Sequence, residues 1–462
     1  MVANRTRLPL TTPVAPIRRL TLLGVVALAV GNMVGTSIWT LPATMAKIAG
    51  PLALAAWAVT AVGYFFIART YSRLGARWPR TGGPYVYVRE AFGDFAGFQT
   101  VWSYWLSATI GNAAIVTAVI GYATGFSDTF RDSPLQQFAL AQALLWGFCA
   151  LNTVGVQHSA RLQIVLMFIT VVPLVLGALV ALPQVRLENM VPFAPMGWGA
   201  LAPACALVVW AFSGVESATV PADEVRDSAA TLGRGTMLGY WVATGVFLLT
   251  ALMVIGTVPT AELAATPRPI ALAMARVVGP WAAVLIGIVA LGSNLATLNG
   301  WVMMAGRIPV SAAQDGLFFP PLARLHPRFR TPHVAMITGT LIPSALLFLY
   351  FSQSLLNVFT FVALLAILST LLPHLYACAA ELMLVRRHPD RYATENRRRV
   401  TIEAFIGFLF VLWTMYGVGA ETAMWGFLAI VAGTPLFVWL QGSTRSIAMS
   451  ASQTADTPDH GV

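Results

Sequence analysis

Two apolar stretches of this chain are each interrupted by small and hydroxyl residues. The first stretch contains Gly31, Gly35, Thr36 and Ser37, and the second contains the sequence AFSGVES at residues 211–217. Glycine permits the dihedral angles that end a helix, while threonine and serine can cap the helix that follows. The helix that follows the first interruption would begin with free N–H groups at the positive end of its dipole, and these suit an anion such as a carboxylate.

The helix ends that precede the two interruptions offer the opposite charge. Asn32 and Met33 in the first stretch, and Trp210 and Ala211 in the second, would present carbonyl groups without helical partners. Carbonyl clusters suit an ammonium group, so the two interruptions together predict a site for a zwitterionic amino acid. The alternative is that the glycines only let membrane helices pack closely.

Glu216 is the only acid well inside a predicted membrane span. An acid at that depth is costly, which makes it a candidate functional group by default. We expect it to exchange a proton as pH or substrate changes. The alternative is a structural carboxyl group that holds the second interruption together.

Polar and aromatic side chains in mid-span are candidates for contact with the substrate side chain. Tyr104, Ala108 and Asn112 are spaced four apart and so share one face of a helix. Trp301 lies away from the interfacial belt where most membrane tryptophans sit, and Trp210 stands at the second interruption. The functional interpretation of Trp301 is stacking on a cationic side chain, and that of Trp210 is closing over the site. Packing is the alternative for each residue.

The elements that carry these residues are membrane helices. Hydrophobic residues make up 57% of the 462 and charged residues 10%, against roughly 25% charged in soluble domains, and the mean hydropathy is +0.73. The net charge of +10 comes from arginines clustered between apolar runs, with Lys47 as the only lysine. No basic stripe of the kind that binds nucleic acid is present, so we expect no nucleic-acid partner. The cysteines Cys149, Cys205 and Cys378 lie in apolar runs and are interpreted as packing residues.

Twelve stretches are long enough to cross a bilayer, at roughly 20 apolar residues each. They lie near residues 21–45, 52–72, 96–124, 136–155, 160–182, 198–219, 235–257, 279–305, 334–352, 356–383, 402–419 and 423–441. We therefore predict an all-α, multi-pass membrane protein.

The distribution of basic residues predicts the orientation of these spans. If the N-terminus is cytoplasmic, every second loop should be rich in arginine. Only Lys47, Arg131, Arg186, Arg268 and Arg276, of the 28 basic residues, fall in the opposite loops. We expect both termini to be cytoplasmic and the protein to lie in the inner membrane.

Spans one to five and six to ten can be laid over each other, because each set begins with an interrupted helix. An odd number of crossings inverts the second copy and places the two interruptions opposite each other near the midplane. The expected organisation is an N-terminal tail over residues 1–20, a first repeat over 21–182, a second repeat over 198–383, two peripheral helices over 402–441, and a disordered cytoplasmic tail over 443–462.

Six segments carry a specific resemblance: GNMVGTSIWTLPA, RTGGPYVYVREAFGDFAGFQT, YWLSATIGN, WAFSGVES, NGWVMMAGR and AAQDGLFFPPLAR. The chain resembles the amino acid, polyamine and organocation transporter superfamily over residues 20–440. It is most similar to the basic amino acid and polyamine antiporters, and among them to arginine/agmatine antiporters. This implies the leucine-transporter type of fold, with five plus five helices in an inverted repeat, and exchange by alternating access.

The resemblance also implies roles. Thr36 and Ser37 would meet the substrate carboxylate, the carbonyls of Met33 and Trp210 its amine, and Asn112 and Trp301 its side chain. The binding residues expected in this way are Asn32, Met33, Thr36, Ser37, Ala108, Asn112, Trp210, Ser213, Trp301 and Ala366. The expected gating residues are Tyr104, Trp210 and His374, and the expected proton sensor is Glu216.

Several positions depart from the arginine/agmatine pattern. The first interruption has Gly-Thr-Ser in place of the usual Gly-Ser-Gly. Thr109 stands where a tryptophan is expected, Ser213 where an isoleucine is, Ala366 where a serine is, and His374 where a tyrosine is. These changes alter the size and polarity of the expected site, so they bear on the substrate and leave the class of transporter intact.

Alternatives within transport stay open. They are an exchanger of polyamines, diamines, ornithine or lysine, and a proton-coupled permease for neutral amino acids. Related proton-coupled permeases place a lysine in the fifth span, and ARLQIVLMFITVVPLVLGALV contains none, which favours exchange. An enzyme or a channel is disfavoured because no catalytic, metal-binding or filter motif is visible. We expect no cofactor and no metal, and leave open whether the chain is a monomer or a homodimer.

Overall fold

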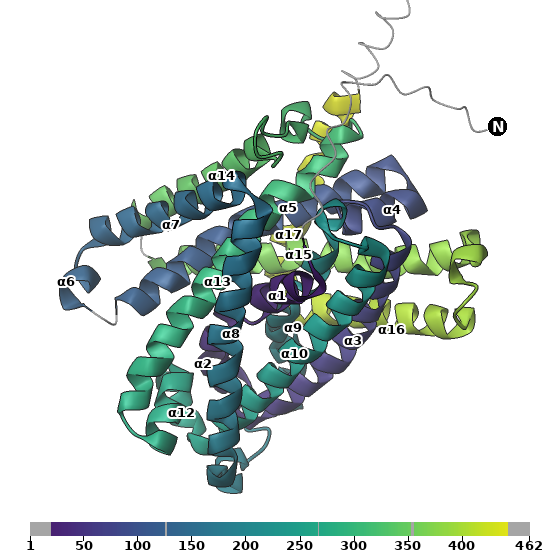
Figure 1. The fold of residues 1–462 in the computed structure, drawn as a ribbon. Coiled ribbons are helices and arrows are strands. Elements are labelled where there is room, and N and C mark those ends of the chain that lie inside the picture. The colour runs from purple at the N-terminus through teal and green to yellow at the C-terminus, as the bar shows by residue number, and fades with distance from the viewer. Residues whose placement is uncertain (1–19, 125–126, 267, 353–354, 442–462) are drawn as a thin grey trace, which may run out of the picture.

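The computed structural model describes residues 20–124, 127–266, 268–352 and 355–441, and nearly all of them are helical (Figure 1). Within these ranges the only strand-like pairing is a single bridge between Leu20 and Val225. The α-helices are α1 (Leu22–Met33), α2 (Thr36–Ile48), α3 (Ala53–Arg77), α4 (Pro84–Phe92), α5 (Asp94–Ala123), α6 (Asp128–Arg131), α7 (Pro134–Val154), α8 (Val156–Ala181), α9 (Leu201–Phe212), α10 (Ser228–Thr257), α11 (Thr260–Ala265), α12 (Pro269–Val278), α13 (Trp281–Gln314), α14 (His333–Ser352), α15 (Leu355–Arg387), α16 (Arg397–Gly417) and α17 (Ala420–Val431).

Short 3-10 turns connect several of these helices. They are η1 (Gly50–Leu52), η2 (Leu182–Gln184), η3 (Leu187–Met190), η4 (Trp198–Ala200), η5 (Val215–Thr219), η6 (Ala222–Glu224), η7 (Pro320–Ala323) and η8 (Pro389–Tyr392).

The described part of the chain contains 11 helices that are long and apolar enough to cross a membrane. They correspond to the expected spans except the one at 334–352. That span is the helix α14, of which His333–Phe348 forms a shorter apolar helix. The expected tails at residues 1–19 and 443–462 lie outside the described residues.

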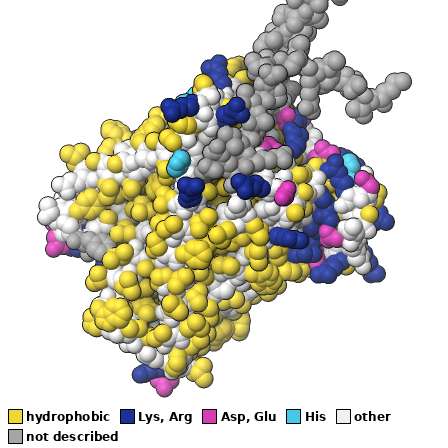
Figure 2. All heavy atoms as spheres, viewed as in Figure 1, with side chains coloured by type: hydrophobic (Ala, Val, Ile, Leu, Met, Phe, Trp, Pro, Cys, Tyr) yellow, Lys and Arg dark blue, Asp and Glu magenta, His cyan; other side chains and the backbone are white. Residues whose placement is uncertain are grey.

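The outside of the bundle is apolar. Hydrophobic side chains cover most of the face in Figure 2, while Lys and Arg gather toward its upper and right-hand parts. Val62 of α3 and Ile288 of α13, for example, are 62% and 54% exposed. An apolar surface of this extent matches a lipid environment.

Helix α1 lies at the centre of the bundle (Figure 1) and is buried from Gly24 to Met33. It packs against α8, α10 and α13, while α5 packs along α13 and α15. The two helices predicted to be interrupted are indeed interrupted. Helix α1 stops at Met33 and α2 starts at Thr36, and α9 stops at Phe212, after which the chain continues as η5 and η6.

The turn η6 is held at one end of the bundle by the start of α1 and the end of α13. The Leu20 N–H donates to the Glu224 carbonyl at 2.9 Å, and the Arg226 N–H donates to the Leu20 carbonyl at 3.0 Å. The Glu224 carboxylate accepts from Arg307 Nε at 2.6 Å. Because the Arg307 side chain is only 1% exposed, this ion pair is shielded from solvent.

The same end is closed by α4 and the loop before it. Thr81 and Asp223 exchange two hydrogen bonds of 3.2 Å between backbone N–H groups and side-chain oxygens. Tyr85 Oη donates to Asp315 Oδ2 at 2.9 Å, and Arg89 pairs with the same carboxylate. Burial, followed by the charge of Asp315, raises the pKa of Tyr85, so its hydroxyl stays a neutral donor.

Candidate functional site

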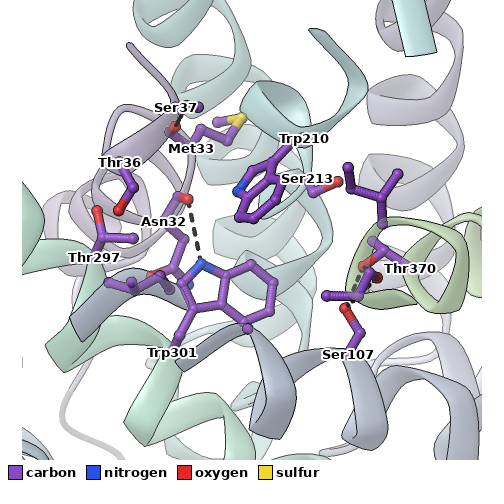
Figure 3. Close-up of a pocket in the computed structure, with 14 residues that line it drawn as sticks. Asn32, Met33, Thr36, Ser37, Ser107, Trp210, Ser213, Thr297, Trp301 and Thr370 are labelled. Carbon is purple, nitrogen blue, oxygen red and sulfur yellow. Dashed lines mark hydrogen bonds between the residues drawn. The ribbon is translucent and has the colours of Figure 1, made fainter. Parts of the chain in front are cut away.

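A cavity lies where the two broken helices meet α5, α13 and α15 (Figure 3). Its volume is about 40 Å³, which is room for about three ordered waters at roughly 10–15 Å³ each. The lining residues are Asn32, Met33, Thr36 and Ser37 from the first break, Trp210 and Ser213 from the second, Ser107, Gly111 and Ile115 from α5, Thr297 and Trp301 from α13, and Ala366, Ile367 and Thr370 from α15. A substrate of amino-acid size therefore requires some of these side chains to move.

Eight of the ten residues expected from the sequence to bind substrate line this one cavity. They are Asn32, Met33, Thr36, Ser37, Trp210, Ser213, Trp301 and Ala366. They come from five helices or their ends, α1, α2, α9, α13 and α15, and the breaks after α1 and α9 bring them together.

The carbonyls released at the end of α1 are met by donors from α13. Ser293, Thr297 and Trp301 are spaced four apart and form a stripe on one face of α13. The stripe donates three hydrogen bonds: Ser293 Oγ to the Val34 carbonyl at 3.1 Å, Thr297 Oγ1 to the Gly31 carbonyl at 2.9 Å, and Trp301 Nε1 to the Asn32 carbonyl at 3.4 Å. Side chains thus satisfy the backbone groups that the break leaves unpaired.

The hydroxyl groups of Thr36 and Ser37 do not cap α2 as predicted. Gly35 occupies the N-cap position without a side-chain hydrogen bond, so Thr36 and Ser37 already lie in the first turn, where a hydroxyl no longer faces the free N–H groups. Ser37 Oγ instead donates back to the Met33 carbonyl at 3.2 Å. The buried Thr36 hydroxyl, and the Asn32 amide, have no hydrogen-bond partner among the described residues.

Glu216 reorganises the backbone at the second break. Were α9 to continue, the Gly214 N–H would donate to the Trp210 carbonyl. It donates instead to Glu216 Oε2 at 2.9 Å, and the Trp210 carbonyl is released from helical pairing. Ser213 turns its hydroxyl back to the Val209 carbonyl at 3.0 Å.

The two breaks touch at Gly214 and Asn32. Gly214 has φ of +122°, and a Cβ added there would lie 3.1 Å from the carbonyl carbon of Asn32. Only glycine combines that dihedral angle with so close an approach. The carbonyl ends of both broken helices therefore lie side by side at the cavity.

Glu216 is wholly buried and contacts two of the expected gating residues. Tyr104 Oη donates to Glu216 Oε1 at 2.9 Å, and His374 Nε2 lies 3.9 Å from Glu216 Oε2. The ring of Tyr104 also meets Trp301 edge to face at 6.4 Å. The expected proton sensor, two gating residues and an aromatic wall of the cavity thus form one contiguous group.

The predicted face of α5 is not the one that meets the cavity. Ser107, Gly111 and Ile115 line it, whereas Ala108 and Asn112 each lie one residue further along, turned by about 100°. Both are 1% exposed, because α13 and α15 pack on α5 from two sides. The Asn112 amide has no partner in the part of the chain that the structure describes.

The wall opposite the first break carries hydroxyl groups that sequence reasoning missed. Ser107 Oγ donates to the Ala366 carbonyl at 2.9 Å and is hydrogen bonded to Thr370 Oγ1. Ala366 itself lines the cavity, where a serine was expected. The spacing of Ala366 and Thr370, one helical turn apart, was the signal that Thr370 shares its face.

Both indole rings line the cavity, Trp210 from α9 and Trp301 from α13, and Figure 3 shows the Trp210 ring above the Trp301 ring. Thr109, in place of an expected tryptophan, adds nothing to the lining, because its hydroxyl is bonded to the Trp105 carbonyl of its own helix at 2.8 Å. Among the described residues no lining side chain is acidic, and no group of three His, Cys, Asp or Glu residues could hold a metal ion.

A cluster of amides stands behind the first break. Asn299 Nδ2 donates to Gln163 Oε1 at 2.8 Å, and Asn299 Oδ1 accepts from Asn152 and Ser159, both at 3.1 Å. Gln163 Nε2 has no hydrogen-bond partner in the described ranges and would lie 2.0 Å from a Cβ added to Gly31. A neutral amide from the fifth span therefore packs directly on the end of α1.

A bundle of apolar helices in which two broken helices meet at a buried cavity is the architecture of a membrane transport protein. The chain belongs to the amino acid permease family, whose profile matches residues 20–447. This places it in the amino acid, polyamine and organocation superfamily, whose members are transporters.

Curated relatives cover most of the chain. An arginine/ornithine antiporter of Pseudomonas aeruginosa is 29% identical over 91% of this chain and 90% of its own length. An arginine/agmatine antiporter of Chlamydia abortus is 27% identical over 90% and 89%. A cadaverine/lysine antiporter of Escherichia coli K12 is 30% identical over 77% and 80%.

Proposed function

We propose that this protein exchanges a cationic amino acid for a related amine by alternating access, with arginine and agmatine as the favoured pair. One observation carries the proposal: the carbonyl ends of both broken helices converge on a cavity walled by Trp210 and Trp301. The substrates named for the relatives, which are cationic amino acids and their amines, support this class.

The backbone of the substrate would bind between the two breaks. Thr36, whose buried hydroxyl has no protein partner among the described residues, and Ser37 stand at the positive end of α2, where a carboxylate is favoured. The carbonyls of Met33 and Trp210 would accept from the ammonium group. The positive end of α2 would thus face the carboxylate of the amino acid, and the carbonyl ends of the two broken helices would face its ammonium group.

The side chain of the substrate would extend between the two indole rings toward Ser107 and Thr370. A guanidinium group can stack on an aromatic ring and donate to hydroxyl oxygens. Such a site avoids the desolvation cost of a buried counter-carboxylate, and it tolerates both a monovalent amino acid and a divalent amine. We retain Asn112 as a proposed ligand, because a buried amide without a partner is rarely left so.

The remaining assignments complete the proposal. We propose that Tyr104, Trp210 and His374 act as gates and that Glu216 senses protons. We further propose twelve spans in an inverted repeat of five plus five helices, with two peripheral helices, both termini in the cytoplasm and the protein in the inner membrane. A homodimer is compatible with this arrangement.

Counterflow in proteoliposomes tests the function. Vesicles loaded with arginine, agmatine, ornithine, lysine, cadaverine, putrescine or leucine are offered labelled arginine, and uptake is compared with that of empty vesicles. We expect arginine uptake to be driven by internal agmatine, and to be absent from empty vesicles. Uptake driven only by ornithine, or only by lysine and cadaverine, would reassign the pair.

A neutral amino-acid permease is the second candidate. It is favoured by Ala366, Ile367 and Ile115 in the lining, which give the cavity an aliphatic wall that suits leucine or valine. Leucine uptake into empty vesicles, driven by a proton gradient and unaffected by arginine, would establish this alternative.

A further inference from the structure

His374 is a buried histidine whose two ring nitrogens have different surroundings. It lies on α15 and is 0% exposed. Its Nδ1 is hydrogen bonded to Tyr71 Oη of α3 at 3.0 Å. Its Nε2 has no hydrogen-bond partner among the described residues, and it lies 3.9 Å from Glu216 Oε2.

Glu216 joins this histidine to the cavity. Its Oε2 accepts from the Gly214 N–H at the second break, and its Oε1 accepts from Tyr104 Oη, both at 2.9 Å. The ring of Tyr104 in turn packs edge to face on the ring of Trp301, which lines the cavity, with the two ring centroids 6.4 Å apart. A continuous series of contacts therefore runs from the substrate cavity through Glu216 to His374.

The other titratable and charged groups around His374 do not compete for this contact. They are Tyr64, Tyr71 and Arg73 on α3, Tyr87 on α4, Tyr104 on α5, Cys378 and Glu381 on α15, and Glu403 on α16. The charged members are occupied with one another, because Arg73 binds Glu381 at 2.8 and 2.6 Å and also pairs with Glu403. The tyrosines and the cysteine carry no charge near neutral pH, because phenol and thiol groups ionise only at higher pH.

His374 Nε2 and Glu216 Oε2, 3.9 Å apart, are not hydrogen bonded but are close enough to form an ion pair, so the position of one proton decides whether the two side chains attract or repel each other. If Nδ1–H donates to Tyr71 Oη, then Nε2 carries a lone pair that faces a carboxyl oxygen, and the contact is favourable only with a protonated Glu216. If Tyr71 Oη donates to Nδ1, then Nε2 carries the hydrogen and can donate to an ionised Glu216. A deprotonated Nε2 beside an ionised carboxylate would leave two acceptors facing each other in a buried site.

We propose that Glu216 and His374 share a proton during transport, so that His374, and not Glu216 alone, sets the pH at which exchange turns on. This rests on the proposed proton-sensing role of Glu216. In the step, the O–H bond of the Glu216 carboxyl breaks and an N–H bond forms at Nε2 of His374, which gives a carboxylate and an imidazolium. Before η5 and α15 move apart, the N–H bond at Nε2 breaks and the O–H bond of Glu216 reforms, so both side chains separate as neutral groups.

His374 in this scheme is a positioning and proton-accepting residue without substrate contact. Its presence stabilises the carboxylate form of Glu216, because an imidazolium would compensate the buried negative charge. Removal of the imidazole should therefore shift the pH dependence of exchange. A purely structural histidine would change the rate equally at every pH.

The test is the rate of exchange against pH in proteoliposomes for the full chain and five variants: E216Q, H374Q, E216Q with H374Q, Y71F and H388Q. We expect E216Q to flatten the profile and H374Q to move its midpoint to higher pH by at least about one unit. The double variant should behave as E216Q does, because the two residues act as one unit. Y71F should move the midpoint with little change in the maximal rate, because it frees Nδ1.

H388Q is the matched control. His388 also faces a glutamate, with Nε2 3.4 Å from Glu90 Oε1, but the two side chains are 29% and 45% exposed. This substitution should leave the midpoint unchanged. Should H374Q prove unstable, Y71F reports on the same pair without altering either member.

Two outcomes are decisive and distinct. A normal midpoint in both H374Q and Y71F, with a flat profile in E216Q, would overturn the shared proton and leave the proposed exchanger standing. Absence of amino-acid exchange in the unmodified protein at every pH would overturn the proposed function itself.

Discussion

Gly214 is the residue at which the two broken helices touch. Its substitution would introduce both backbone strain and a clash between the two breaks. Gly214→Ala forces an L-residue into φ of +122° and places a Cβ 3.1 Å from the Asn32 carbonyl carbon. We expect a loss of about 1–3 kcal/mol in the free energy of unfolding, measured by thermal unfolding in detergent, and loss of exchange.

Gly419→Ala is the control for backbone strain alone. Gly419 also has positive φ, +92°, but a Cβ there would meet no atom within 4 Å. It should lose stability and keep exchange. Equal exchange in both variants would show that contact between the breaks is not needed for transport.

Trp301 is the residue we expect to distinguish cationic from neutral substrates. Trp301→Ala removes a ring that faces the cavity and the donor to the Asn32 carbonyl. Arginine binding, measured by calorimetry, should weaken by roughly 1–2 kcal/mol, and each 1.4 kcal/mol is about tenfold in Kd. Trp281→Ala, at the exposed start of the same helix with 61% exposure, should leave Kd unchanged.

If leucine binds more tightly than arginine and Trp301→Ala leaves the Kd of arginine unchanged, the protein is a neutral amino-acid permease and not a cationic exchanger.

The residues at the two breaks could be predicted because their types are unusual inside an apolar span. The α5 lining could not be predicted, because the spacing of Tyr104, Ala108 and Asn112 says only that they share a face. Which face meets the cavity depends on how α5 sits between α13 and α15. The hydroxyl pair of Ser107 and Thr370 joins residues 263 positions apart, and no local pattern carries such a contact.

At the scale of the element, helix α1 depends on a close contact with the fifth span. A Cβ on Gly31 would lie 2.0 Å from Gln163 Nε2. Gly31→Ala should therefore displace the glutamine and lower the free energy of unfolding by about 1–3 kcal/mol, measured by thermal unfolding in detergent. Gln163→Ala alone removes both the clashing atoms and the acceptor of Asn299 Nδ2, so in that background Gly31→Ala should cost little further stability.

Gly24→Ala, on the same helix, is the control. Its nearest neighbour would be Leu20 Cδ2 at 3.5 Å, an ordinary contact, and stability should not fall. An equal loss from Gly31→Ala in the unmodified and Gln163→Ala backgrounds would mean that α1 is sensitive to helicity at the break rather than to this contact.

The membrane helices could be predicted from the apolar pattern. A segment in lipid must hydrogen bond all its own backbone groups, which a helix does, and a helix needs about 20 apolar residues to cross the bilayer. Their ends were harder to predict. The chain after Phe212 continues as 3-10 turns, since Glu216 takes the Gly214 N–H that an α-helix would use. Such a bond from a side chain to the backbone is set by tertiary packing.

At the scale of the whole molecule, the arginine-rich loops should face the cytoplasm. Single cysteines at Arg80, Arg324 and Thr394, all exposed positions, should be labelled by a membrane-impermeant maleimide only after the cells are opened. A cysteine at Ser127 should be labelled in intact cells. Labelling of any two of the first three in intact cells would contradict both the orientation and the twelve-span topology.

The natural cysteines do not interfere with this measurement. Cys149, Cys205 and Cys378 are all buried, and burial among apolar groups leaves a thiol inert. The unmodified protein therefore serves as the unlabelled reference.

The small volume of the cavity, about 40 Å³, has a kinetic consequence. A ligand of amino-acid size can associate only with a wider conformation, so association should be slower than with a site that is already open. If that wider conformation holds about 1% of the population, the apparent Kd is about a hundredfold weaker than the intrinsic one. A substitution far from the substrate that favours the wider conformation would then tighten binding without adding a single contact.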